Sequence, residues 1–353
     1  LYKVEIMGSP EDKIKLFRLP RKKERILHWY NNGKRKEQNL FNPIINIEKL
    51  DYSEEMTCFY VDNKEHLFLM NDFIVTHNTR TMIADFCYCA CSEIYENGEW
   101  ISTGDPQPAL FISTELELDE LQTMMVAFLS GIDEERILNN TASSWGEERE
   151  RINHAIELIK NSPMYLEVIP DFSLKDIENT IKRNIRVHKC RYIFLDYIHT
   201  SMKILEEISR RSGGIKLRED NVLFLLSVKL KDICNQFGVF ILSSTQLNQS
   251  WKSDDIPDQN LLRGAKSIAD KIDIGSILLD VTAEDREALQ SLVGDGRMPN
   301  VKLSVYKNRR GSYNKCYLWM HADKSTCRFN GLFCTDYNYE PIAIKDINIT
   351  MIN

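Results

Sequence analysis

The alternation of hydrophobic and polar positions changes character near residue 79. Ahead of that point, short segments alternate apolar and polar residues with a period of two, as in "TCFYV" (57–61), "HLFLM" (66–70) and "DFIVT" (72–76). This period is typical of β-strands that bury one face. We therefore expect a small all-β unit before residue 79.

After residue 79, apolar runs of the length of a strand alternate with segments of helical periodicity. The strand-like runs are "ALFIS" (109–113), "YLEVIP" (165–170), "YIFLDY" (192–197) and "VFILSS" (239–244). Helices are expected at about 118–129, 173–189 and 221–238. Apolar strands that alternate with helices predict a parallel sheet covered on both faces, so the expected fold class is α/β.

Length and composition limit the number of domains and the class of protein that the chain can form. The 353 residues allow two domains, and 43% hydrophobic with 27% charged residues is ordinary for a soluble globular protein. No apolar run approaches the ~20 residues that span a bilayer, so we expect a cytoplasmic protein without a membrane partner. The nine cysteines lack paired Cys-x-x-Cys spacing, which favours reduced thiols over disulfides or zinc sites. The first residue, Leu1, suggests a fragment of something longer.

The net charge of −7 argues against nonspecific coating of DNA by the whole surface, but it leaves room for a local basic channel.

The tripeptide "HNT" (77–79) lies where the two patterns meet. The side-chain amide of Asn78 can attack its own backbone carbonyl and break the following peptide bond, and His77 can supply the proton that the leaving amine needs. The hydroxyl of Thr79 can then accept an acyl group. Since His and Asn are also common in turns, the tripeptide alone is a weak signal for self-cleavage.

The longer run "MTCFYVDNKEHLFLMNDFIVTHNT" (56–79) resembles the C-terminal splicing motifs of inteins. The resemblance implies a Hint-type intein segment over 21–78, preceded by the tail of a homing-endonuclease insertion over 1–20. It also implies that Cys58 and His66 assist proton transfers, that His77 assists cyclisation of Asn78, and that Thr79 begins a host protein over 79–353. The N-terminal half of an intein is absent, so the chain is not expected to splice alone.

Three predicted strands of the host segment end in groups that ATP hydrolysis uses. Asp196 ends its strand as a Walker B carboxylate does beside Mg²⁺, Glu115 could orient the attacking water as general base, and Gln246 could sense the γ-phosphate. Taken singly, these are also an ordinary core strand, a helix-start acid and a turn. Together they predict one site, because the carboxyl ends of parallel strands converge.

Thr79 fits the same site, as the hydroxyl that ligates Mg²⁺ at the end of a phosphate loop. On this interpretation the glycines and the lysine of the loop lie upstream of the intein, outside this chain.

Residues 79–353 resemble the RecA-like core of the DnaB-type replicative helicases. The resemblance rests on "FISTELELDELQTMMVAFLSGI", "YIFLDYIHT" and "SSTQLNQ", and it implies a P-loop ATPase that uses ATP and Mg²⁺ and forms a hexameric ring. "SVYKNRRG" (304–311) is similar to the strand that carries a Lys-x-Arg finger, which implies that Lys307 and Arg309 reach a neighbouring subunit's ATP. Arg310 is a close rival to Arg309.

"LLRGAKSIADKIDIGSILL" (261–279) is similar to the family's central-channel stretch. This similarity implies contacts from Arg263, Lys266 and Lys271 to the phosphates of single-stranded DNA. Two alternatives stay open: a RecA-like recombinase or helicase loader, and a splicing element with a degenerate ATPase remnant. The remnant is disfavoured by the presence of all the expected functional residues: Glu115, Asp196, Gln246, Lys307 and Arg309.

Overall fold

The computed structural model describes residues 78–139, 146–211, 219–245, 271–294, 296–309, 311 and 313–343. They all belong to the compact unit Phe73–Asn353. The predictions for residues 1–77 lie outside the described residues.

A four-stranded parallel sheet forms the centre of the described part. Its strand order is β4-β3-β5-β6, and every neighbouring pair is parallel. The bounds are β3 Ala109–Ser113, β4 Met164–Val168, β5 Tyr192–Asp196 and β6 Phe240–Ser243. The predicted parallel α/β sheet is therefore confirmed for these four strands.

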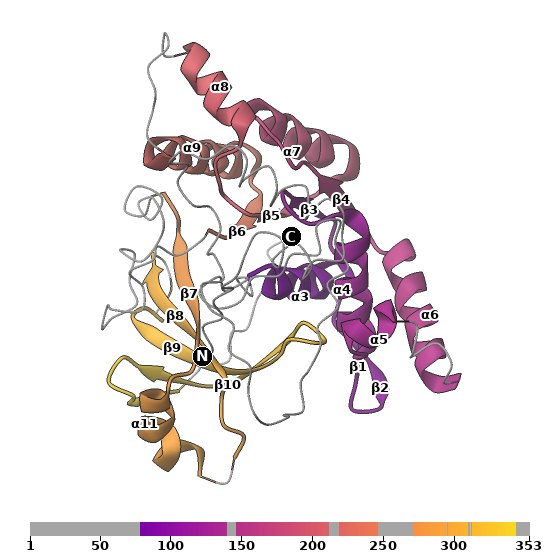
Figure 1. Cartoon of the computed structure of the whole chain (residues 1–353), viewed down its shortest axis with the longest axis vertical. Helices are drawn as coiled ribbons and strands as arrows, with labels where there is room; N and C mark the ends of the chain where they lie inside the picture. Colours follow the sequence, from indigo (N-terminus) through magenta and orange to yellow (C-terminus); the bar gives the residue numbers. More distant parts are fainter. Residues whose placement is uncertain are drawn as a thin grey trace, which may run out of the picture. The chain divides into compact units, whose positions relative to one another are not determined.

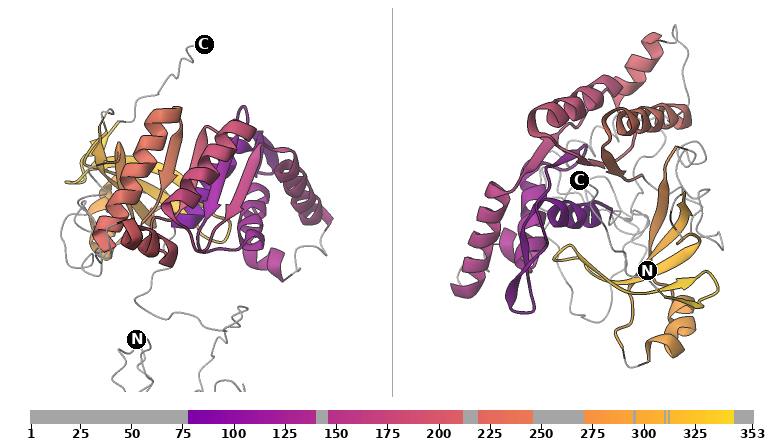
Figure 2. Two further views of the ribbon diagram at one scale, coloured as in Figure 1. Left: turned by 90° about the horizontal axis from the view of Figure 1, so that it is seen from above. Right: turned by 180° about the vertical axis from the view of Figure 1, so that it is seen from behind.

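Helices cover both faces of the parallel sheet, as Figures 1 and 2 show. One face packs against α3 (Asn78–Ala90) and α4 (Leu118–Ser130). The other packs against α7 (Leu174–His188), α8 (Met202–Arg211) and α9 (Glu219–Phe237). The predicted helices match α4, α7 and α9 to within about two residues, the accuracy that helix ends allow. Helix α3 begins at Asn78, so Thr79 lies in its first turn.

Successive residues of the central strands point to opposite faces, which explains their continuous apolar character. Phe111 and Phe194 face α3, where each ring lies 5.4 Å from that of Phe86 in an edge-on arrangement. Leu110 and Ile193 face the other way, into the core shared with α7, α8 and α9. Burial on both faces leaves no position in these strands for the polar alternation seen before residue 79.

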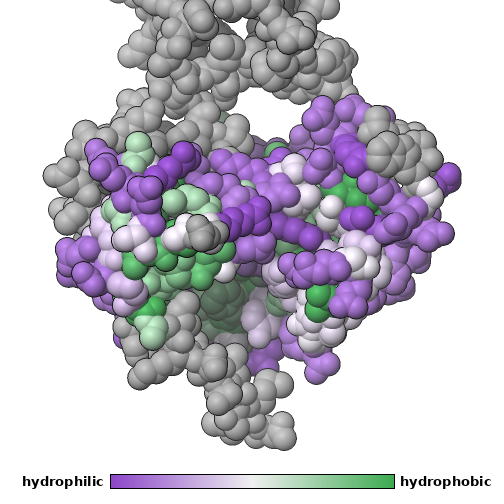
Figure 3. Space-filling view, turned by 90° about the horizontal axis from the view of Figure 1, so that it is seen from below, coloured by the Kyte–Doolittle hydropathy of each residue, from purple (hydrophilic) through white to green (hydrophobic). Residues whose placement is uncertain are grey.

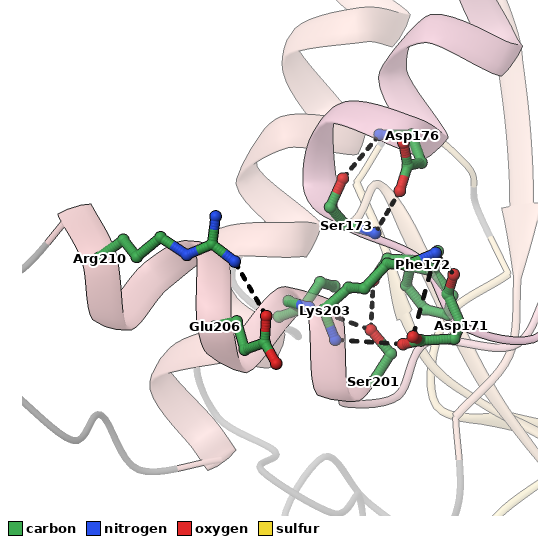
Figure 4. Close-up of polar contacts among 9 residues, drawn as sticks. Asp171, Phe172, Ser173, Asp176, Ser201, Lys203, Glu206 and Arg210 are labelled. Carbon is green, nitrogen blue, oxygen red and sulfur yellow. Dashed lines mark hydrogen bonds and ion pairs between the residues drawn. The ribbon is translucent and has the colours of Figure 1, made fainter.

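Local capping sets the start of α7 at the predicted place. The Ser173 hydroxyl accepts a hydrogen bond from the Asp176 backbone N–H at 3.1 Å, and the Asp176 carboxylate accepts one from the Ser173 N–H at 2.9 Å (Figure 4). This reciprocal pair satisfies two backbone donors that a helix start leaves unpaired.

A second, antiparallel sheet was largely missed by the sequence pattern. Its order is β11-β10-β9-β8-β7, with bounds β7 Ile274–Asp280, β8 Val301–Asn308, β9 Cys316–Asp323, β10 Arg328–Asp336 and β11 Pro341–Ile342. Only β8 was anticipated, as a strand over 304–311, and it ends at Asn308. The part of the chain after residue 79 is thus not a parallel sheet throughout.

Helix α11 (Ala283–Val293) connects β7 to β8 and packs on the antiparallel sheet around Trp319. A buried ion pair holds it there, with Lys302 Nζ 2.7 Å from both carboxylate oxygens of Asp285. Burial opposes ionisation of Asp285, but the hydrogen bonds from Lys302 and Thr282 outweigh it and lower the pKa of that carboxyl.

The remaining elements gather beside α4. They are the hairpin β1 (Glu93–Glu96) and β2 (Glu99–Ser102), which the sequence did not predict, with α5 (Glu134–Leu138) and α6 (Gly146–Asn161). No helix in the described ranges is long and apolar enough to cross a membrane. The eight cysteines of the described part are all free.

Candidate nucleotide and magnesium site

The first residues of α3 meet the carboxyl ends of the parallel strands. The Thr79 hydroxyl donates a hydrogen bond of 2.6 Å to Asp196 Oδ2, and the Ser244 hydroxyl donates one of 3.2 Å to Oδ1. Thr79 and Asp196, which the sequence assigned to one site from positions 117 residues apart, therefore lie in direct contact. Ser244 follows β6 and adds a third oxygen-bearing side chain to the cluster.

Asp196 is only 4% exposed. Burial raises the pKa of its carboxyl, the hydrogen bonds from Thr79 and Ser244 act in the opposite direction, and the nearby charge of Glu115 adds to the rise. A carboxylate kept from water without a cation beside it is a costly arrangement. The buried Asp196 carboxylate therefore favours the binding of a cation beside it.

Glu115 lies on the bend between β3 and α4, where its carboxylate accepts a hydrogen bond of 2.8 Å from the Tyr197 hydroxyl. The capping carboxylate of α4 is a different one, since Glu120 accepts the backbone N–H of Glu117 at 2.9 Å. Glu115 is thus tied to the residue that follows Asp196 and does not serve as the helix-start acid.

Backbone contacts through Thr114 fix the distance between the two acidic residues. Both the Thr114 backbone N–H and its hydroxyl donate to the carbonyl of Asp196 at 2.9 Å. The Tyr197 N–H in turn donates to the Thr114 hydroxyl at 3.2 Å. Thr114 is 2% exposed, so this brace lies in the core beneath the site.

The donor set fits Mg²⁺ bound together with a nucleotide. Mg²⁺ prefers hard oxygen ligands and is commonly held by one or two protein groups plus phosphate oxygens and water. One buried carboxylate beside the hydroxyls of Thr79 and Ser244 supplies that chemistry. Within the described ranges, no cluster of three or more His, Cys, Asp or Glu side chains could hold a metal ion by itself.

The predicted finger residues lie on the antiparallel sheet. Lys307 is half-buried near the end of β8, and Arg309 follows the strand with its side chain 46% exposed and Nη1 3.9 Å from Asp273 Oδ1. Lys271, predicted to contact DNA, lies just before β7 with Nζ 5.3 Å from the centre of the Phe224 ring.

Several predicted residues lie outside the described residues: Gln246, Arg263, Lys266, Arg310, Cys58, His66 and His77. The backbone of Asn78 forms the start of α3.

Sequence reasoning missed Ser244, Thr114 and Tyr197. A signal existed for each, since Ser244 and Thr114 directly follow apolar strands and Tyr197 directly follows Asp196. Polar residues that extend past a parallel strand's carboxyl end are candidates for the site at that edge.

The parallel sheet, the helices on both faces and the Thr79–Asp196 contact together define an α/β domain of the RecA-like class. The family model described as the DnaB-like helicase C-terminal domain matches residues 91–330. The chain therefore belongs to the DnaB-like helicase C-terminal domain family.

One relative is the SPbeta prophage-derived uncharacterized protein YorI of Bacillus subtilis (strain 168), which is 34% identical over 306 residues. The match covers 84% of this chain and 60% of YorI, so the chain spans well under the full length of that relative. The aligned share exceeds what residues 79–353 alone make up, so the similarity also reaches ahead of Thr79.

Two solved structures share the fold at a TM-score of 0.50. One is a DnaB-like replicative helicase described with its interactions with primase, at 16% identity over 64% of this chain and 51% of that one. The other is described as an ATPase domain, at 17% identity over 64% of this chain and 75% of that one.

Proposed function

We propose that this chain carries the ATPase core of a replicative DNA helicase, which hydrolyses ATP with Mg²⁺ and unwinds duplex DNA while moving along a single strand. The observation that carries the proposal is the contact of Thr79 with Asp196 at the carboxyl ends of the parallel strands, with Glu115 held just after the adjacent strand β3. Membership of the DnaB-like family supports the substrate class.

The residues divide the work by their chemistry. Asp196 and Thr79 would hold Mg²⁺, which neutralises charge on the phosphates when it is bound. Glu115, as general base, would accept a proton from the attacking water. The hydrogen bonds of Thr114 hold the end of β3 against the end of β5. Asp196 and Glu115 could therefore act from the positions that they have in this structure.

A ring is the assembly that suits the finger residues. Lys307 and Arg309 belong to the antiparallel sheet, and a finger that acts on a neighbour's nucleotide requires an oligomer. Exposed large apolar side chains such as Phe240 (51%) and Ile274 (61%) are present, and Figure 3 shows a face where hydrophobic residues gather beside hydrophilic surface. Contiguous exposed apolar surface is typical of protein contacts. Lys271, with Arg263 and Lys266, would contact DNA phosphates in the ring's channel.

Substitution of Glu115 tests the motor. In the full-length protein that contains this chain, Glu115→Gln should keep Mg²⁺-dependent ATP binding and lose ATP turnover by about 10²- to 10⁴-fold, because a positioned base is removed. Glu117→Gln, two residues along the same exposed connection, is the matched control and should turn over ATP normally. Normal turnover in Glu115→Gln would exclude Glu115 as the base, and ATP hydrolysis without unwinding of a forked duplex would favour the recombinase or loader alternative.

We also propose that residues 21–78 form the C-terminal segment of an intein. The support is in the sequence, where His77 and Asn78 stand directly before a hydroxyl residue, Thr79, which also contacts Asp196 of the proposed ATP site. Similarity to YorI extends ahead of Thr79, so a direct splicing experiment decides the role of this segment.

An N-terminal intein half supplied in trans should yield a ligated product whose host part begins at Thr79. Asn78→Ala should block release, because cyclisation needs the side-chain amide, whereas Asn97→Ala in the β1–β2 turn should leave splicing unchanged. Ligation by the Asn78→Ala chain would rule the intein proposal out.

A further inference from the structure

Tyr197 makes a contact that neither the motifs nor the Mg²⁺ chemistry requires. Its hydroxyl donates to Glu115 Oε1 at 2.8 Å, although the two residues belong to different strand ends. We propose that Tyr197 is the positioning residue that holds Glu115 in its catalytic orientation, an inference that rests on the proposed ATPase function.

The backbone around Tyr197 is held on both sides. On the strand side, its N–H donates to the buried Thr114 hydroxyl at 3.2 Å. On the far side, the Ile198 N–H donates to the Ser244 carbonyl at 2.8 Å. The phenol is therefore presented from a segment fastened to β3 and to the end of β6.

The next residues extend this support towards α7. The His199 ring lies edge-on to Phe172, with centroids 5.1 Å apart, and tilted against the Tyr197 ring at 4.8 Å. The Ser201 hydroxyl donates to the Phe172 carbonyl, and Figure 4 shows this contact beside the start of α8. Packing and hydrogen bonds thus restrict both the backbone and the ring of Tyr197.

Glu115 needs such support because it is exposed on a bend and has a long side chain. An exposed glutamate samples many rotamers, and a general base acts only from the orientation that faces the water. The Tyr197 hydrogen bond occupies Oε1, and the part of the chain that the structure describes offers no hydrogen bond to Oε2. Oε2 is then the oxygen that would accept the proton from the attacking water.

Removal of the single hydroxyl tests the assignment in the full-length protein. Tyr197→Phe should lower kcat for ATP by about 10-fold, the effect expected for one lost hydrogen bond to a charged group. The KM for ATP and the Mg²⁺-dependent affinity for a fluorescent ATP analogue should not change, because Asp196 and Thr79 are intact. Tyr95→Phe is the matched control, because it also removes a tyrosine hydroxyl that bonds a glutamate. Tyr95 lies in the β1–β2 hairpin, and its hydroxyl donates to Glu147 Oε1 of α6 at 3.1 Å. The Tyr95→Phe protein should have normal kcat.

A double-mutant cycle separates positioning from a general structural role. In the Glu115→Gln background, Tyr197→Phe should cause no further loss of kcat. If Tyr197→Phe lowers kcat equally in the wild-type and in the Glu115→Gln protein, the assignment is overturned. It is also overturned if Tyr197→Phe alone has normal kcat while Glu115→Gln alone is impaired. Normal kcat in Glu115→Gln alone would instead refute the role of Glu115 in the proposed function, which the cycle thereby tests separately. Thermal unfolding of each variant identifies any loss that comes from misfolding.

Discussion

At the scale of single residues, the buried Asp196 carboxylate lowers the stability of the folded protein, a cost that its proposed role in Mg²⁺ binding would explain. Its pKa is raised in the folded protein, chiefly by burial, so the folded state holds a proton more tightly than the unfolded state does. Stability therefore falls as the pH rises from the unfolded value towards the folded pKa, and the full cost is present above the folded pKa. Above the folded pKa the ionised Asp196 carboxylate carries this cost, which a bound cation would relieve.

Asp196→Asn should accordingly raise the Tm of the nucleotide-free protein at pH 8, by about 2–4 °C for each kcal/mol gained in a domain of 150–250 residues. The gain should shrink as the pH falls from the raised folded pKa of Asp196 towards the unfolded aspartate pKa of about 4, where it should be nearly gone. Mg²⁺-dependent nucleotide binding should be lost. Asp280→Asn, at a surface pair with Lys324, is the control and should leave Tm nearly unchanged. A lower Tm for Asp196→Asn at pH 8 would contradict the argument. Differential scanning fluorimetry across pH measures both variants.

At the scale of elements, the C-terminal end of α4 is stabilised by arginine side chains from other elements of the chain. It ends at Gly131, whose φ of 65° is left-handed, and no basic residue lies in its last turn. Arg328 of β10 donates to the Phe128 carbonyl through Nε at 3.1 Å and Nη2 at 2.8 Å, and Arg151 of α6 donates to the Ser130 carbonyl. These contacts satisfy terminal carbonyls and complement the negative end of the helix dipole. They also attach the antiparallel sheet to the helix that follows Glu115.

Arg328→Met should lower the free energy of unfolding by about 1–3 kcal/mol, because it keeps much of the side-chain volume but leaves buried carbonyls without donors. Arg183→Met is the control, since Arg183 is 58% exposed and pairs with Glu167 at the surface. That change should cost at most about 1 kcal/mol. Urea denaturation with an unchanged slope measures the difference, and equal stability of the two variants would show that Arg328 is dispensable.

At the scale of the whole molecule, the proposed chemistry is divided between two sheets. Thr79, Asp196 and Glu115 lie at the edge of the parallel sheet, whereas Lys307 and Arg309 lie at the end of β8 in the antiparallel sheet. A Cβ on Gly275 would lie 2.4 Å from the Tyr306 ring, so β7 and β8 are closely packed just before the finger residues. In a ring, each composite site would take its base from one subunit and its finger from the next.

Mixing two inactive variants tests this division. Arg309→Ala and Glu115→Gln should each lose most ATP turnover while the ring stays assembled, and mixed rings should recover part of it, because some interfaces then contain both an intact base and an intact finger. Arg286→Ala, on α11, is the control for a lost surface arginine. If no mixture recovers ATP turnover, the result argues against a finger that acts between subunits. Steady-state assays measure ATP turnover, and size measurement of the ring checks its assembly.

The sequence by itself determined the local elements and the residue types at their ends. Continuous apolar runs predicted β3 and β5, helical periodicity predicted α4, α7 and α9, and the strand ends pointed to Asp196 and Glu115, because local patterns of burial and capping are written in neighbouring positions. Only the tertiary structure decided which groups meet. The Tyr197–Glu115 bond joins residues 82 apart and the Arg328–Tyr95 contact residues 233 apart. The antiparallel sheet likewise arises from pairings between separate strands, such as β8 with β9. Such contacts depend on the relative placement of whole elements, which side-chain periodicity along one segment does not specify.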